Sequence, residues 1–177
     1  DFKHATYKQL GKYETEDQIA AAKYLANKPY IDENNIGIFG WSYGGYMSSL
    51  CITKGADVFK SAIAVAPVTN WRYYDNIYTE RFMQKPQDNG ENYDINSPIN
   101  HVEKLKGNFL LIHGTADDNV HFQNATEMVS ALVNKNKQFE FFAYPDKNHG
   151  IYGGFTRLHL YTKMTNFLME TLMEDNE

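Results

Sequence analysis

The chain has 177 residues, of which 42% are hydrophobic and 15% aromatic, and its formal net charge is −5. This length suits one compact domain, and the apolar content is too high for a disordered chain. The positive and negative charges are interspersed, which argues against a nucleic-acid surface. No apolar run approaches the roughly 18 residues that a membrane span needs. The first residues also lack the pattern of a signal peptide.

Helical and extended patterns alternate along the chain. Helices are predicted over residues 15–27, 44–54, 122–134 and 155–173, and strands over 35–40, 61–66, 109–113 and 139–144. The strands are short and lack strict alternation, which is typical of a parallel sheet covered by helices on both faces. An α/β fold is therefore predicted, and in such sheets ligands bind outside the carboxyl ends of the strands.

Residues 67–106 interrupt this alternation. The segment is long, rich in Trp and Tyr, and directly follows the end of a predicted strand. Because long loops in compact domains usually serve a function, we expect it to contribute to a binding site and to contain short helices.

A nucleophile elbow is predicted between the first strand and the second helix. Residues 40–44 (GWSYG) fit the pattern G-x-S-x-G, in which a strained turn lifts the hydroxyl of Ser42 above the sheet. The flanking glycines let the strand and the helix approach closely. The backbone N–H of Tyr43, at the N-terminus of the helix, would then stabilise an oxyanion.

Two later segments supply an acid and a base in the chain order that hydrolases with this elbow use. The strand at 109–113 leads into an acidic loop with Asp117 and Asp118, and the strand at 139–144 is followed by His149. Spacing alone leaves the choice between Asp117 and Asp118 open. Since a serine hydroxyl needs such a base to become a nucleophile, the sequence predicts a serine hydrolase of the α/β-hydrolase type.

Other reactive side chains have simpler interpretations. Cys51, the single cysteine, follows an apolar stretch and is expected to be buried and inert. His113 ends a predicted strand and is expected to make supporting hydrogen bonds. No Cys/His cluster has metal-ligand spacing, so neither a metal nor another cofactor is expected.

Five stretches together resemble the catalytic domain of the prolyl oligopeptidase family of serine peptidases, in order and over nearly the whole chain. They are GWSYGGY at 40–46, VAPVTNW at 65–71, YYDNIYTER at 73–81, HGTADDNVHFQ at 113–123, and His149 with the glycine after it. The resemblance favours Asp117 over Asp118, so it implies a triad of Ser42, Asp117 and His149.

The same resemblance implies the substrate-binding residues. The pocket for the residue before the scissile bond matches Tyr43, Val68, Trp71, Tyr74, Tyr78 and Val120. Asn119 matches a residue that binds the next substrate carbonyl, and Arg81 matches a supporting position nearby. An apolar aromatic cage suits proline, which is compact and lacks an N–H.

The resemblance also implies parts of the enzyme beyond this chain. The family's hydrolase domain has further upstream strands, with a tyrosine that donates the second oxyanion hydrogen bond, and a β-propeller whose glutamates hold the substrate's amino group. We therefore expect residues 1–177 to form the C-terminal half of an α/β-hydrolase domain, with a mostly parallel sheet flanked by helices, and to be weakly active or inactive alone. A homodimer and a periplasmic, secreted or cell-surface location are also implied.

The predicted activity is that of a serine exopeptidase, which acts on peptides and releases N-terminal dipeptides with Pro or Ala in the penultimate position through an acyl-enzyme. Three alternatives would use the same triad: a prolyl oligopeptidase-like endopeptidase, an acylaminoacyl peptidase and an esterase. They differ in how the enzyme binds the end of the substrate that lies away from the scissile bond. A catalytically dead interaction module belongs to another class, and the presence of the Ser, Asp and His argues against it.

Overall fold

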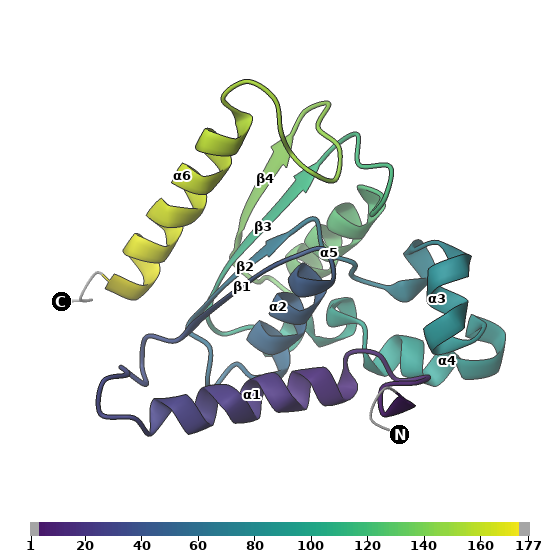
Figure 1. The fold of residues 1–177 in the computed structure, drawn as a ribbon, viewed down its shortest axis with the longest axis horizontal. Helices are drawn as coiled ribbons and strands as arrows, with labels where there is room; N and C mark the ends of the chain where they lie inside the picture. The colour runs from purple at the N-terminus through teal and green to yellow at the C-terminus, as the bar shows by residue number, and fades with distance from the viewer. Residues whose placement is uncertain (1–3, 174–177) are drawn as a thin grey trace.

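The computed structural model describes residues 4–173. One parallel sheet has the strand order β1-β2-β3-β4, made of β1 (Gly37–Trp41), β2 (Ser61–Val65), β3 (Asn108–Gly114) and β4 (Glu140–Tyr144). Helix α6 (Thr156–Leu168) covers one face, and α2 (Tyr43–Lys54) and α5 (Gln123–Asn134) cover the other (Figure 1). Helix α1 (Lys12–Ala26) packs beside α2. This arrangement confirms the predicted α/β fold.

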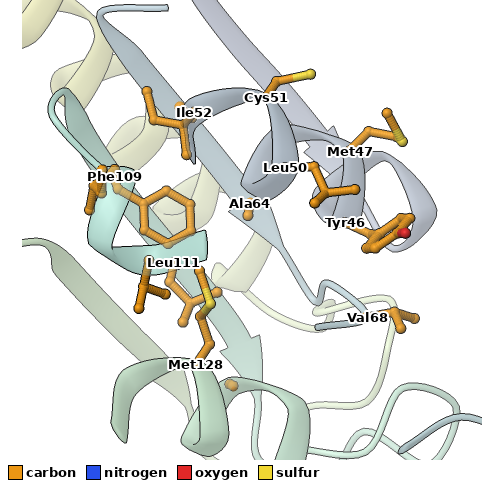
Figure 2. Close-up of a cluster of buried hydrophobic side chains, with 14 of the residues drawn as sticks. Tyr46, Met47, Leu50, Cys51, Ile52, Ala64, Val68, Phe109, Leu111 and Met128 are labelled. Atoms are coloured by element: carbon orange, nitrogen blue, oxygen red, sulfur yellow. The ribbon is translucent and has the colours of Figure 1, made fainter. Parts of the chain in front are cut away.

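Alternate residues of the central strands belong to two separate cores. On β2, Ala62 and Ala64 pack into the core that contains α2, whereas Ile63 and Val65 pack into the core that contains α6. All four side chains are fully buried. Figure 2 shows the first core, where side chains from α2, β2, β3 and α5 meet. Because both faces of the sheet are covered, its strands are apolar without strict alternation.

Strand β1 forms one edge of the sheet. Among the residues that the structure describes, it pairs only with β2, and the side chain of Phe39 is half exposed. A cavity of about 730 Å³ lies beside this edge, and its lining includes Leu25, Ile36 and Ile38. An open apolar edge of this kind is a site where another strand can pair.

Residues 67–106 contain the expected short helices. They are the 3₁₀ helix Trp71–Tyr73, α3 (Asn76–Met83), α4 (Pro86–Ile95) and the 3₁₀ helix Pro98–Lys104. The first two helices begin at side-chain caps: the N–H of Arg72 donates to Asn70 at 2.9 Å, and the N–H of Tyr78 donates to Asp75 at 2.8 Å. The other two helices have a proline in their first turn, where its missing N–H costs nothing.

Two helices differ from the sequence-based prediction. Helix α1 begins at Lys12, three residues early, because Gly11 adopts a φ of 88° and its N–H donates to the carboxylate of Glu14 at 3.0 Å. The predicted helix over 155–173 is divided: α6 ends at Leu168, and Met169–Met173 continues as a π-helical turn. The remaining boundaries move by one or two residues, which is usual at the ends of helices and strands.

Candidate active site

Ser42 lies at the turn between β1 and α2, in the conformation that a nucleophile elbow requires. Its φ of 58° and ψ of −115° are strained for a residue with a side chain, and its N–H donates to the carbonyl of Val65 at 2.8 Å. A Cβ at Gly40 would come within 2.0 Å of the carbonyl oxygen of Gly44, so only glycine allows the strand and the helix to pass this closely. Tyr43 is the first residue of α2, where backbone N–H groups have no partner within the helix.

The loops after β3 and β4 bring an acid and a base together. Nδ1 of His149 lies 2.7 Å from Oδ2 of Asp117, whose side chain is fully buried. Asp118, the alternative acid, is exposed to solvent. Because a carboxylate only accepts hydrogen bonds, Nδ1 of His149 carries a proton in this contact, and Nε2 is the ring nitrogen left available to accept one.

The carboxylate of Asp117 is surrounded by donors. Oδ1 accepts the backbone N–H groups of Asn119 at 3.0 Å and of Val120 at 2.9 Å. Oδ2 accepts His149 and also lies 3.3 Å from Nε2 of His113. Burial opposes ionisation, but the hydrogen bonds from His113, His149 and the N–H of Asn119 outweigh it and hold the pKa of this carboxyl well below its usual range. Asp117 is therefore ionised at neutral pH.

His113 is fully buried and makes the supporting contacts that the sequence led us to expect. Its Nε2 donates to the carbonyl oxygen of Val120 at 2.7 Å as well as facing Asp117. Its Nδ1 has no hydrogen-bond partner among residues 4–173, so the polar contacts of this ring are made through Nε2.

An aromatic cluster lies beside the elbow and is centred on Trp71. The indole is stacked on the ring of Tyr78 at 5.8 Å and meets three further rings within 5.9 Å, those of Tyr43, Tyr46 and Tyr74. Trp71 is only 1% exposed, so it forms the base of the cluster, whereas Tyr74 and Tyr78 are partly open to solvent. The predicted pocket residues Tyr43, Trp71, Tyr74 and Tyr78 are thus brought together.

The two valines of the predicted pocket are buried in the same core as Trp71. Val68 follows β2 and is 2% exposed, and Val120 in the loop of Asp117 is fully buried. The hydroxyl of Tyr74 donates to Oδ1 of Asn119 at 2.7 Å, which links the cluster to the same loop. A cavity of about 600 Å³ opens here and is lined by Arg72, Tyr73, Tyr74, Asp75, Asp118, Asn119, His121 and Gln123.

Arg81 is placed differently from the other predicted binding residues. It is exposed on α3 and lines a separate cavity of about 590 Å³, together with His4, Thr6, Tyr7 and Phe82. Its link to the aromatic cluster is indirect, since the ring of Phe82 packs on that of Tyr78 at 4.8 Å.

Glu14 belongs to this site, although its sequence context gave no sign of it. Its Oε1 accepts the hydroxyl of Tyr43 at 2.6 Å from α1, some 29 positions earlier in the chain. Burial and then the hydrogen bond to Glu14 raise the pKa of the Tyr43 phenol far above its usual range, so the ring stays neutral. Glu14 thereby anchors the side chain of Tyr43, the residue that directly follows Ser42.

Cys51 is buried in the core that contains α2. Burial raises the pKa of the Cys51 thiol to about 12, which leaves it unreactive at neutral pH. Among the residues that the structure describes, no group of three or more His, Cys, Asp and Glu side chains is arranged to hold a metal. Within residues 4–173, no helix combines the length and apolar character needed to cross a membrane.

Known proteins resemble this chain along nearly its whole length. The model of the prolyl oligopeptidase family matches residues 1–175. The chain belongs to the prolyl oligopeptidase family. Prolyl endopeptidase FAP of Mus musculus is 50% identical over 172 residues, and dipeptidyl peptidase 4 of Felis catus is 45% identical over 170 residues. The crystal structure of Porphyromonas gingivalis dipeptidyl peptidase 4 superimposes with a TM-score of 0.93 at 50% identity, which confirms the hydrolase fold.

The relatives in the prolyl oligopeptidase family are much longer than this chain. The matches cover 96% of the chain but 23% of the mouse protein, and 94% of the chain but 22% of the cat protein. For the Porphyromonas gingivalis structure the shares are 94% and 24%. The chain therefore spans about a quarter of the length of these relatives.

Proposed function

We propose that this chain supplies the triad and the proline pocket of a serine exopeptidase that releases N-terminal dipeptides with Pro or Ala in the penultimate position. The observation that carries the proposal is the hydrogen bond from His149 to the buried, ionised Asp117 in a chain that holds Ser42 in an elbow. Membership of the prolyl oligopeptidase family supports it independently.

In the proposed reaction, Oγ of Ser42 attacks the scissile carbonyl while Nε2 of His149 takes its proton. The N–H of Tyr43 stabilises the negative oxygen of the tetrahedral intermediate. Asp117 stays ionised, keeps the proton on Nδ1 and stabilises the imidazolium. His149 then protonates the leaving amine as the C–N bond breaks. Water, deprotonated by His149, finally attacks the acyl-enzyme, releases the dipeptide and restores the serine hydroxyl.

Substrate selection follows from the aromatic cluster. The open rings of Tyr74 and Tyr78 offer apolar faces to a proline ring, and alanine fits the same space with fewer contacts. A charged side chain would be buried there without a partner, which is costly. Because the Tyr74 hydroxyl donates to Oδ1 of Asn119, the amide NH₂ of Asn119 is left to donate to a substrate carbonyl.

An endopeptidase is the second candidate, since the mouse relative bears the name prolyl endopeptidase. It would use the same triad and pocket. The test compares Gly-Pro, N-blocked Gly-Pro and short acyl ester substrates on the protein at its full natural length, with Ser42→Ala as the blank. An exopeptidase cleaves Gly-Pro and spares the blocked peptide. Equal cleavage of both peptides favours the endopeptidase, and cleavage of the esters alone contradicts both.

Three properties of the whole protein are part of the proposal. In the family resemblance, the second oxyanion donor and the glutamates that hold the amino group come from outside this chain, so the 177 residues alone are a weak peptidase. The whole protein forms a homodimer and works in the periplasm, at the cell surface or after secretion. Comparing this chain with a longer form of the protein on a Gly-Pro substrate tests the first point, and equal rates would contradict it.

A further inference from the structure

The turn that carries His149 has a strained backbone. Ile151, two residues after the base, has a φ of 43°, which is unfavourable for a β-branched residue. Its side chain is fully buried in the core beneath α6, and its N–H donates to the carbonyl of Asn148 at 3.0 Å. Strained conformations of this kind persist only where the surrounding contacts enforce them.

Two side chains provide such contacts. Nε of Arg157, in the first turn of α6, donates to the carbonyl oxygens of Gly150 at 3.1 Å and of Ile151 at 3.2 Å. The indole N–H of Trp41 donates to the carbonyl oxygen of His149 at 3.0 Å. Three successive carbonyl groups of the turn are therefore held from outside it.

The two side chains also contact each other. The guanidinium of Arg157 lies over the indole of Trp41, 5.4 Å from the ring centroid. Trp41 is the last residue of β1 and directly precedes Ser42. One connected set of contacts thus joins the start of α6, the turn of the base and the strand that delivers the nucleophile.

We propose that Arg157 is a positioning residue for His149. By holding the strained turn against Trp41, it fixes where the imidazole lies relative to Ser42. The inference rests on the proposed function, because it presupposes that these two residues react. Arg157 touches neither the reacting atoms nor the pocket described above, so its loss slows proton transfer and leaves substrate binding unchanged. A displacement of about 1 Å in a reacting group can cost on the order of 100-fold in rate.

The test is Arg157→Gln in the protein at its full natural length. Its matched control is Lys163→Gln on the same helix, where the ammonium lies 5.4 Å from the ring of Phe142 and pairs with Glu140 at 3.2 Å. Active sites are counted by complete fluorophosphonate labelling, and kcat and KM are measured per labelled site. We expect Arg157→Gln to lower kcat by about 10- to 100-fold with KM changed less than about twofold, and Lys163→Gln to match the wild type.

Arg157→Lys adds a graded readout. Lysine can donate to a carbonyl but lacks the planar fork that stacks on an indole, so its kcat is expected between those of the wild type and Arg157→Gln. Wild-type rates per labelled site in Arg157→Gln would overturn the inference, even if its thermal stability or active fraction fell. A wild type that neither reacts with fluorophosphonate nor cleaves any of the substrates would instead overturn the proposed function, and the inference with it.

Discussion

Replacing Asp117 by asparagine is expected to invert the hydrogen bonding of the base. The backbone N–H groups of Asn119 and Val120 point at Oδ1 and cannot reverse, so the amide oxygen of the new side chain must take that place. The amide NH₂ then faces His149, which donates through Nδ1 in the wild type. Because the new amide NH₂ and the N–H at Nδ1 of His149 are both donors, they cannot face each other, and the ring must move its proton to Nε2. A protonated Nε2 can no longer accept the proton of Ser42.

The expected loss in kcat for Asp117→Asn is about 10⁴-fold, or about 5 kcal/mol in the activation barrier. KM should change little, because Asn119 and Val120 keep their backbone hydrogen bonds. The assay is steady-state hydrolysis of a Gly-Pro substrate, with the exposed neighbour Asp118→Asn as the control at wild-type rate. Near-normal kcat in Asp117→Asn, or an equal loss in Asp118→Asn, would refute this reasoning.

Three further variants or conditions extend these tests. Tyr74→Phe removes the hydroxyl that donates to Asn119 at 2.7 Å, so kcat/KM for Gly-Pro substrates should fall about 2- to 10-fold, whereas Tyr161→Phe, at an exposed position on α6, should not change it. Trp71→Ala, at the base of the aromatic cluster, should lower the free energy of unfolding by about 3–5 kcal/mol in urea; a loss below about 1 kcal/mol would show that the ring is not part of the core. The pKa of Asp117 is lower in the folded state than in the unfolded state, where it is about 3.9. Its ionised carboxylate therefore contributes fully to stability above pH about 3.9, and this contribution is lost as the pH falls towards the pKa of the folded state. The stability difference between wild type and Asp117→Asn should therefore shrink from pH 6 to pH 3, and a constant difference would count against the ionised state.

The parts of the site that the sequence predicted depend on local rules. The elbow at Ser42 follows from glycine spacing between a strand and a helix, and the position of His149 follows from the end of an apolar strand. The choice between Asp117 and Asp118 could not be made from spacing, because it depends on how the loop turns its N–H groups onto one carboxylate. That turn becomes visible only when the backbone is folded.

The parts that the sequence missed depend on contacts across the fold. Glu14 reaches Tyr43 because α1 packs beside α2, and Arg157 reaches the turn of the base because α6 covers the sheet. No local pattern distinguishes these two charged residues from others on the helix surfaces. The sequence also could not show that the ring of Trp71, a predicted pocket residue, is only 1% exposed and packs against the rings of Tyr74 and Tyr78.

Covalent labelling tests the central claim most directly. The protein is treated with a fluorophosphonate, digested, and mapped by mass spectrometry, alongside Ser42→Ala and His149→Ala. We predict one adduct on Ser42 in the wild type, none in Ser42→Ala, and labelling slowed by orders of magnitude in His149→Ala. An adduct on another residue, or labelling of His149→Ala at the wild-type rate, would contradict the assignment of nucleophile and base.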